Sequence, residues 1–270
     1  MELSVVSPAG ARRAYAYTGG KPLDASRPTV VFVHGALHDH SVWTLPARWF
    51  ANHGHSVLAP DLPGHARSAG PALDSIEALA AWLLALLDAA GVGNAALVGH
   101  SMGALIALEA AAQAPERITR LALLGLAVPM AVSPALLATA RDTPLQAIDM
   151  VNAYSHSTSA AKPSYPGPGS WLHGANQALM RRVQEGHAER NLFLVDFEVC
   201  NRYAGGLEAA AKVRSPTTLV VGERDQMTPP RQAAAIAAAL HAGVITVNAG
   251  HAMVAEAPDA VLAALRKAVG

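Results

Sequence analysis

The 270-residue chain contains few charged residues, few aromatic residues and a single cysteine. Because Cys200 has no second cysteine to pair with, a disulfide framework within the chain is excluded, and a reducing compartment is favoured. The 20 basic residues equal the 20 acidic residues in number, and no long basic run disturbs that balance. We therefore expect no nucleic-acid partner.

Long apolar runs are also absent from the sequence. The most apolar helical stretch, residues 76–92, contains Glu77 and Asp88 and is too short and too interrupted to span a bilayer. Residues 1–17 lack the basic start and apolar stretch of a secretory signal. These features predict a cytoplasmic protein without a membrane partner. Apolar residues still make up 51% of the chain, enough for a substantial buried core.

Short apolar runs alternate with helical patterns along most of the chain. The run PTVVFVHGA at residues 28–36 is typical of a strand buried on both faces of a parallel sheet. Comparable runs occupy residues 55–64, 94–103, 118–126, 216–225 and 243–251. The series predicts an α/β fold in which helices flank an open, mostly parallel sheet. Residues 3–19 are expected to add an antiparallel hairpin at its edge.

The alternation breaks once, between residues 131 and 215. This segment shows helical patterns and a Pro/Gly-rich loop at residues 162–171, but no convincing core strand. Because it lies between two predicted strands, we interpret it as an inserted helical cap. Residues 1–130 and 216–270 would then form the core domain.

Residues 99–103 read GHSMG, which matches the pattern G-x-S-x-G directly after an apolar strand and directly before a helix. A nucleophile on a sharp, strained turn needs neighbours without side chains, so that the Ser101 hydroxyl can project above the sheet. The N–H of Met102 would then face the same space. From the five residues alone, an ordinary strand–helix turn that contains a serine is the alternative.

A serine hydroxyl needs a base to act as a nucleophile, and the base needs an orienting carboxylate. Asp225 and His251 each follow a predicted strand, and groups beyond the carboxyl ends of such strands can meet. We therefore predict a triad of Ser101, Asp225 and His251. Glu223 is the alternative carboxylate, because it lies two residues before Asp225 on the same strand face.

Other nucleophiles and bases are less favoured by their surroundings. Cys200 would need a histidine partner and a sharp turn, and EVCNRY indicates neither. His65, His100 and His187 have no predicted partner, and all three are interpreted as structural. Because His100 directly precedes the nucleophile, its side chain is expected to point away from the site.

The motifs VVFVHGA, DLPGHARS, LVGHSMG, LVVGERDQMTP and NAGHAMVAEAP, in this order, resemble those of α/β-hydrolase-fold proteins of the capped esterase type. The resemblance covers nearly all of the chain outside the predicted cap. It departs at Ala66, where the family often has glycine. It implies an oxyanion hole formed by the backbone N–H groups of Ala36 and Met102, with Leu37 as the weaker alternative to Ala36.

The resemblance further implies a serine hydrolase without a cofactor. The expected partner is a small-molecule substrate, namely a small carboxylic ester or lactone. It would be cleaved through an acyl-enzyme on Ser101, with His251 as base and Asp225 as orienting acid. The same triad in a carbon–carbon bond hydrolase of ring-fission products, a perhydrolase or an acyltransferase is an alternative, as is a slow-turnover ligand receptor. Epoxide hydrolases and haloalkane dehalogenases of this fold attack with an aspartate, and here the elbow carries serine. A homodimer is left open.

Residues near the predicted triad are expected to line an apolar substrate pocket. Ordinary core packing is the alternative interpretation for each of them. The pocket residues that we predict are Leu37, His38, Trp43, Leu126, Val128, Trp171, Met227 and Met253.

Residues 34–40 bring together three histidines and an aspartate, a spacing that would also suit a metal site. A complete serine triad leaves a metal without a task, so no metal is expected. We instead expect His34 to fix the loop that supplies the second oxyanion donor by hydrogen bonding. His38 and His40 would lie further along this loop, near the mouth of the site.

Overall fold

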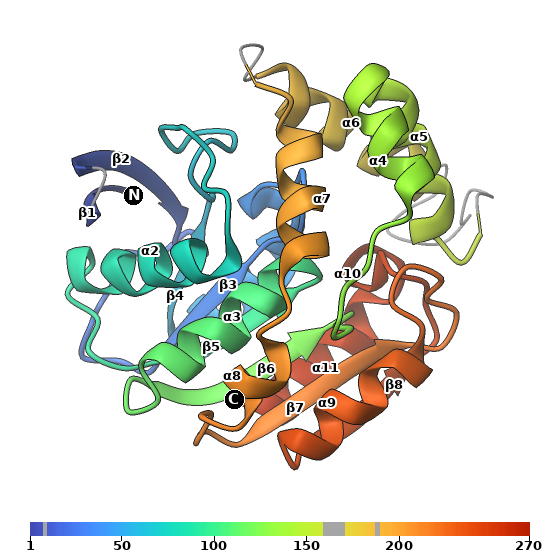
Figure 1. Ribbon diagram of the computed structural model, residues 1–270. Helices are drawn as coiled ribbons and strands as arrows, with labels where there is room; N and C mark the ends of the chain where they lie inside the picture. The colour runs from blue at the N-terminus through green and yellow to red at the C-terminus, as the bar shows by residue number, and fades with distance from the viewer. Residues whose placement is uncertain (8–9, 159–170, 187–189) are drawn as a thin grey trace.

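A single mixed sheet lies at the centre of the computed structural model, which describes residues 1–7, 10–158, 171–186 and 190–270. Within these residues the sheet has eight strands in the order β1-β2-β4-β3-β5-β6-β7-β8 (Figure 1). The strands are β1 (Glu2–Ser7), β2 (Gly10–Tyr17), β3 (Thr29–Val33), β4 (Ser56–Pro60), β5 (Ala95–His100), β6 (Ile118–Leu124), β7 (Thr217–Gly222) and β8 (Gly243–Val247). Strands β3 to β8 pair in parallel, whereas β1 and β2 are antiparallel. The predicted α/β sheet with an edge hairpin is confirmed.

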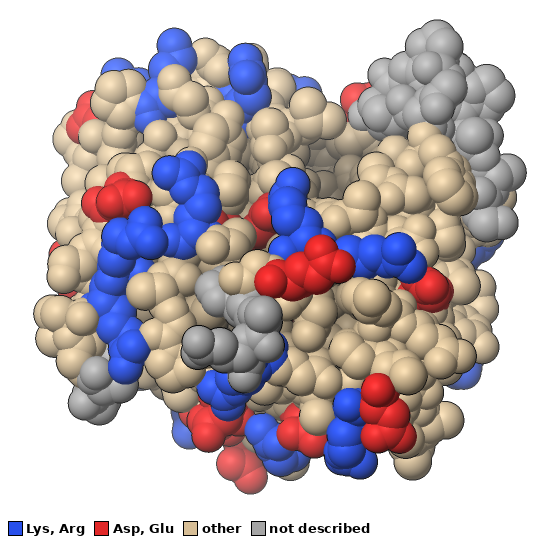
Figure 2. All heavy atoms as spheres, turned by 90° about the horizontal axis from the view of Figure 1, so that it is seen from above, with Lys and Arg blue, Asp and Glu red and all other residues tan. Residues whose placement is uncertain are grey.

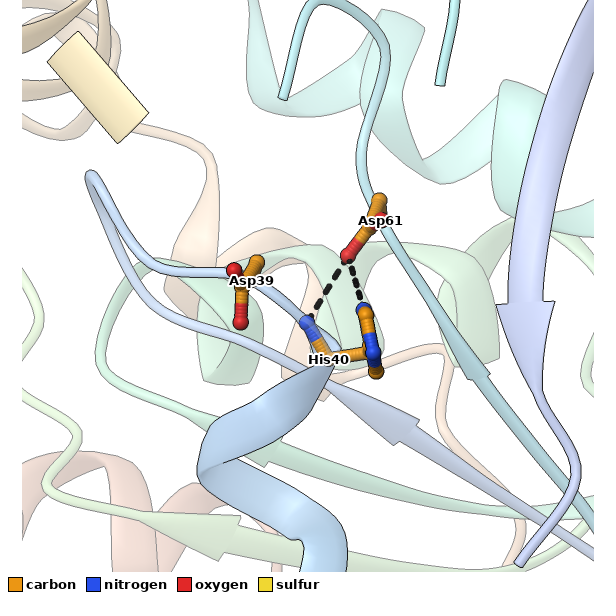
Figure 3. Close-up of side chains that lie close together, drawn as sticks. All are labelled: Asp39, His40 and Asp61. Atoms are coloured by element: carbon orange, nitrogen blue, oxygen red, sulfur yellow. Dashed lines mark hydrogen bonds and ion pairs between the residues drawn. The ribbon is translucent and has the colours of Figure 1, made fainter. Parts of the chain in front are cut away.

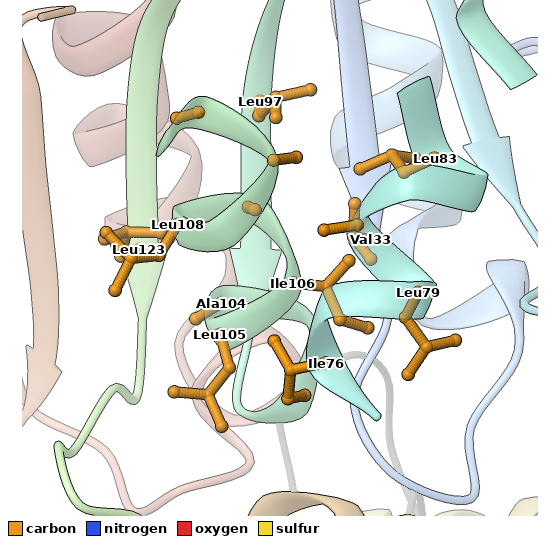
Figure 4. Close-up of a cluster of buried hydrophobic side chains, with 14 of the residues drawn as sticks. Val33, Ile76, Leu79, Leu83, Leu97, Ala104, Leu105, Ile106, Leu108 and Leu123 are labelled. Carbon is orange, nitrogen blue, oxygen red and sulfur yellow. The ribbon is translucent and has the colours of Figure 1, made fainter. Parts of the chain in front are cut away.

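Helices cover both faces of this sheet. On one face lie α2 (Ile76–Ala89), α3 (Met102–Gln113), α8 (Gly206–Ala210) and α9 (Ala234–Ala239), and on the other lie α1 (Thr44–Asn52) and α11 (Pro258–Val269). Successive residues of β3 alternate between the two layers. Val31 and Val33 pack in the cluster with α2 and α3, as Figure 4 shows for Val33, and Val30 and Phe32 pack with α1 and α11. Burial on both faces explains why the strand is a continuous apolar run.

Local signals set the ends of α2. The Ser75 side chain accepts a hydrogen bond from the Ala78 N–H at 3.1 Å, and Glu77 places a negative charge in the first turn. The helix then presents an apolar stripe that includes Leu79 and Leu83 to the sheet (Figure 4). Gly91, with φ of +69°, follows its end.

Four further helices lie between β6 and β7 in the chain: α4 (Pro134–Asp142), α5 (Pro144–Ser155), α6 (Leu172–Glu185) and α7 (Leu192–Arg202). Most of their buried apolar side chains form a separate cluster, in which Phe193 stacks on Phe197 with ring centroids 4.3 Å apart. Leu37, from the loop after β3, also belongs to this cluster. Val199 and Cys200 of α7 instead join the cluster of the sheet, α2 and α3. The described residues of 131–215 contain no strand, as the sequence predicts. The Pro/Gly-rich stretch 162–171, except for Trp171, and His187 lie outside the described residues.

Short helical turns complete the connections near the strand ends. They are η1 (His40–Trp43), η2 (Pro230–Ala233) and α10 (Met253–Glu256). Within the described part of the chain, none of the helices is long and apolar enough to cross a membrane.

Candidate active site

Ser101 lies at the junction of β5 and α3 in a backbone conformation that side chains rarely adopt, with φ of 55° and ψ of −120°. The turn closes only because its neighbours lack side chains. A Cβ on Gly99 would collide with the carbonyl oxygen of Gly103, and a Cβ on Gly103 would collide with the carbonyl oxygen of Val33. Strain of about 1–3 kcal/mol at such a residue is typical of positions held for function.

His251 and Asp225 form a buried pair at the ends of two adjacent strands, β8 and β7. His251 Nδ1 lies 2.8 Å from Asp225 Oδ2. Asp225 Oδ1 accepts the N–H groups of Met227 and Thr228, both at 2.8 Å, and Thr228 Oγ1 donates to Oδ2 at 2.7 Å. Burial alone would raise the pKa of Asp225, but the adjacent His251 and these hydrogen bonds lower it. The carboxylate is therefore ionised and oriented toward the imidazole.

Glu223, the alternative carboxylate, does not share this environment. Its side chain is exposed, and its N–H donates to the carbonyl oxygen of Val247 as part of the strand pairing. The geometry therefore favours Asp225 as the partner of His251. Thr228, which sequence reasoning missed, is signalled by its position three residues after Asp225, where a turn can return its N–H and hydroxyl to the carboxylate.

A cavity of about 470 Å³ lies between the strand ends and the inserted helices. Ser101, Thr228 and His251 line it together with Ala36 from the loop after β3. Gly125, with φ of +58°, leaves room for the His251 ring, because a Cβ there would lie 3.1 Å from His251 Cε1. The structure thus brings the three predicted triad residues and one predicted oxyanion residue to one site.

The loop that carries His251 is braced by a buried carboxylate that the sequence did not reveal. Glu256 Oε2 accepts the N–H of Gly250 at 2.7 Å, and Oε1 accepts the N–H of Ser157, also at 2.7 Å. In addition, the N–H of Ala252 donates to the carbonyl oxygen of Ser155 at 2.8 Å. The end of α5 and the base loop are therefore tied together.

Ala36 and Met102, the two predicted oxyanion donors, lie beside Ser101. A Cβ on Gly35 would lie 3.3 Å from the Ser101 Cβ, so the loop that carries Ala36 contacts the elbow. Met102 is the first residue of α3, directly after Ser101. The N–H of Leu37 donates to Asp196 Oδ2 at 2.8 Å and is thus already engaged.

The predicted substrate pocket agrees only in part with the lining of the cavity. His38 and Met227 are among the lining residues. The other predicted residues lie elsewhere. Leu37 packs among the inserted helices, Trp43 and Met253 pack in the core on the α1 and α11 side, and Leu126 and Val128 pack against the α2 and α3 side. Trp171 is exposed and stacks on His173. Sequence reasoning missed lining residues from the inserted segment, among them Val132, Leu136, Met150, Met180 and Phe197, and also Met130 directly before it.

His100 does not point away from the site, contrary to the sequence-based expectation. Its Nε2–H donates to the carbonyl oxygen of His251 at 2.9 Å, and the two rings lie 4.8 Å apart. Burial and the adjacent His251 lower the pKa of His100 to about 3. The expectation failed because the sharp turn begins at Ser101, and the space left by Gly125 admits both rings.

His40 and the two aspartates beside it, Asp39 and Asp61, are held by protein groups (Figure 3). Ligating atoms of Asp39, His40 and Asp61 lie within 4.8 Å of one another. Asp61 Oδ1 accepts both the backbone N–H and the ring Nδ1–H of His40 at 2.8 Å, as Figure 3 shows. Asp39 accepts from the Ser41 N–H at 2.8 Å and from Arg182 at 2.7 Å. These contacts explain why the three side chains lie close together: they brace the loop.

His34 also has both ring nitrogens engaged. Its Nε2 accepts the Leu62 N–H at 3.0 Å, so Nδ1 carries the proton and donates to the carbonyl oxygen of Gly35 at 2.9 Å. Burial, together with the adjacent His65, lowers the pKa of His34 to about 4. A neutral His34 therefore ties the start of the loop to the segment after β4.

Acidification is expected to destabilise the fold through His34 and His100. Each has a pKa near 6.5 in the unfolded chain, so the folded protein binds fewer protons below that pH, and stability is lost as the pH falls from about 6.5 toward about 4. The free energy of unfolding should drop by about 2 kcal/mol per histidine between about pH 7.5 and about pH 5. His65, whose pKa is raised, acts oppositely as the pH rises through its folded value. Urea unfolding across this range measures the effect; a flat profile would contradict it.

Comparisons with known proteins place the chain in a family. The sequence profile of the alpha/beta hydrolase family matches residues 30–264. An epoxide hydrolase of Caballeronia sordidicola is 37% identical over 105 residues, which cover 38% of this chain and 31% of that protein. The chain spans about a third of the length of the curated relatives it matches.

Two solved structures share the fold at low sequence identity. An esterase from Exiguobacterium antarcticum is 16% identical with a TM-score of 0.83, covering 99% of this chain and 98% of that one. An enol-lactonase from Burkholderia xenovorans LB400 is 22% identical with a TM-score of 0.78, covering 95% and 96%. Sheet, elbow and family profile agree, and the chain belongs to the alpha/beta hydrolase family.

Proposed function

We propose that the protein is a serine hydrolase that cleaves an uncharged carboxylic ester or lactone through an acyl-enzyme on Ser101. The observation that carries this proposal is the shared cavity: a serine on a strained elbow and a histidine paired at 2.8 Å with a buried carboxylate line the same space. Nucleophile, base and orienting acid are the three parts that acyl transfer requires.

The proposed reaction has two steps. His251 takes the proton of Ser101 as its oxygen attacks the carbonyl carbon, and Asp225 stabilises the imidazolium. The N–H groups of Ala36 and Met102 stabilise the oxyanion, each contributing about 3 kcal/mol to lowering the barrier. His251 then gives the proton to the leaving alkoxide. In the second step His251 activates a water that cleaves the acyl-enzyme and returns the proton to Ser101.

The inserted helices support the role of a cap in this proposal. Of the predicted cap segment, residues 131–215, α4 to α7 would form the cap, whereas α8 packs on the sheet beside α3 and belongs with the core of residues 1–130 and 216–270. The described lining of the cavity includes side chains from α4, α5, α6 and α7 on one side and from the strand ends on the other. A substrate between them would be largely enclosed, which excludes water from the acyl transfer.

The cavity lining favours an uncharged substrate over a carboxylate-bearing one. Most of its described side chains are apolar, including four methionines that can adapt to different shapes: Met130, Met150, Met180 and Met227. Among the described lining residues there is no Lys or Arg. The face of the molecule drawn in Figure 2 carries both basic and acidic side chains. A buried carboxylate without a partner is costly, so anionic ring-fission products fit this site less well than neutral esters.

Covalent labelling tests the proposed nucleophile. A fluorophosphonate should add once per chain to the wild-type protein, and peptide mapping by mass spectrometry should place the adduct on Ser101. Ester hydrolysis should fall in proportion to the labelled fraction. An adduct elsewhere, with full activity retained, would refute the assignment. Turnover below about one per minute on every ester, with tight binding of an uncleaved ligand, would indicate the receptor alternative.

A matched substrate pair tests the proposed substrate class. p-Nitrophenyl hexanoate and the mono-p-nitrophenyl ester of adipic acid have acyl chains of equal length, but only the second ends in a carboxylate. The neutral ester should have a kcat/KM higher by about 30-fold or more, because the pocket offers the carboxylate no cation. Equal values would reject the neutral substrate class and leave the serine mechanism standing.

A further inference from the structure

The loop of residues 35–40, which follows β3 and contains the proposed oxyanion donor Ala36, is held from outside the core. We call it the oxyanion loop. Three successive residues of this loop each contact a different side chain of α6 or α7: Leu37 contacts Asp196 at 2.8 Å, His38 contacts Asn176 at 2.9 Å, and Asp39 contacts Arg182 at 2.7 Å. The inserted helices therefore act on the geometry of this loop directly.

The contact at Asp196 differs from the other two, because it holds the backbone of the oxyanion loop. Asp196 lies on α7 with its side chain only 3% exposed, and its Oδ2 accepts the N–H of Leu37. Leu37 has φ of +54°, a left-handed conformation that costs a leucine about 1–2 kcal/mol. A backbone so strained persists only where surrounding groups enforce it, and Asp196 supplies one such bond.

His65 makes this acceptor a charged one. The carbonyl oxygen of Pro63, which can only accept a hydrogen bond, lies 3.2 Å from Nδ1 of His65. Its Nε2 faces Asp196 Oδ2 at 2.9 Å, which already accepts the N–H of Leu37. Both ring nitrogens therefore carry protons. Burial by itself would lower the pKa of His65, but the Asp196 carboxylate raises it overall. The pair is a buried imidazolium–carboxylate, and the bond to Leu37 is charge-assisted.

Ala36 lies between two anchored neighbours. On one side, Gly35 packs on Ser101 and its carbonyl oxygen accepts the Nδ1–H of His34 at 2.9 Å. On the other side, the N–H of Leu37 is fixed by Asp196. Because the orientation of a peptide N–H follows from the peptide planes around it, these anchors set the direction of the Ala36 N–H. With the Leu37 N–H occupied, Ala36 is the N–H of this pair that remains for the substrate.

We propose that Asp196 is a positioning residue that aims the Ala36 N–H at the oxyanion, so that α7 of the inserted segment completes the oxyanion hole. This rests on the proposed acyl transfer at Ser101. Asp196 touches neither the substrate nor the reacting atoms; it acts through the backbone of Leu37, while His65 balances its charge.

Asp196→Asn tests the proposal with little change in shape. In the wild type one charged oxygen accepts from both Leu37 and His65. The amide oxygen that replaces it carries no charge, so the bond to Leu37 is no longer charge-assisted and His65 loses its counter-ion. We expect kcat for a neutral aryl ester to fall about 10- to 100-fold, with KM within about twofold, because the oxyanion donor loses its aim. Affinity for a trifluoromethyl ketone, which forms an oxyanion adduct on Ser101, should fall in parallel. Binding of the matching unreactive amide should not change.

Arg182→Gln is the matched control, because it removes a contact of the same inserted helices to a side chain of the oxyanion loop. Its kcat should stay within about twofold of wild type. If Asp196→Asn does not fold, as circular dichroism would show, His65→Gln carries the test with a smaller loss of the same kind. An unchanged kcat, or equal losses for the ketone and the amide, would overturn the proposal. Failure of the wild type itself to form the ketone adduct would instead reject the serine mechanism.

Discussion

Replacing Ser101 with alanine is expected to lower kcat for ester hydrolysis by about 10⁵- to 10⁶-fold. The change removes the attacking oxygen, while His251, Asp225 and the oxyanion donors keep their positions. A residual rate above that in water would come from those donors and from binding alone. The measurement is steady-state turnover of a neutral aryl ester, with preparations checked for traces of wild-type enzyme by fluorophosphonate labelling.

The same variant should keep the fold. Alanine adopts the strained backbone at residue 101 no more easily than serine, and the glycine contacts that close the turn are unchanged. The melting temperature should therefore stay within a few degrees of wild type. Cys200 also lines the cavity, but burial raises the pKa of its thiol, so it is not a thiolate that could replace the serine. Activity within about tenfold of wild type would contradict the proposed nucleophile.

The positions of the three proposed triad residues could be predicted because each depends on a short local pattern. Glycines around Ser101 permit a turn that other residues would block, and Asp225 and His251 each follow a strand whose position the apolar runs reveal. The parallel arrangement of those strands then brings the residues together. Local sequence is sufficient wherever a strand end defines the position of a side chain.

The lining of the cavity could be predicted only in part, because it depends on how helices face one another. Trp43 and Met253 lie close in sequence to loop or triad residues, yet both pack into the core. Met150 and Met180 lie on inserted helices, and helical spacing alone does not tell which of two apolar contacts, with the core or with the cavity, they make. Asp196 escaped prediction because its partners, Leu37 and His65, lie 159 and 131 residues away.

The departure from the family pattern at residue 66 leaves the backbone strained there. Ala66, where the family often has glycine, has φ of +42°, a conformation that favours glycine. The strain of about 1–2 kcal/mol is borne in a turn where the N–H of Ser68 donates to the carbonyl oxygen of His65 at 2.9 Å. The turn thus holds the segment that presents His65 to Asp196.

Asp225→Asn is expected to lower kcat by about 10⁴-fold by giving His251 the wrong tautomer. Asp225 Oδ1 accepts two backbone N–H groups, so the amide oxygen of the variant would take that position. Its NH₂ group would then face His251 Nδ1, which must accept a hydrogen bond instead of donating one. The proton would move to Nε2, and His251 could no longer take the proton of Ser101. Thr228 Oγ1 can turn to accept from the same amide, which stabilises the arrangement.

Glu223→Gln is the matched control for this variant, because it makes the same chemical change on an exposed carboxylate two residues earlier. Its kcat should stay within about twofold of wild type. The measurement is kcat and KM for both variants, together with their melting temperatures, since Asp225→Asn keeps the size of the buried side chain. A large loss in Glu223→Gln with a small one in Asp225→Asn would transfer the acid role to Glu223. If instead both variants retain activity, the hydrolysis proceeds without a carboxylate-oriented histidine, and the proposed triad is wrong.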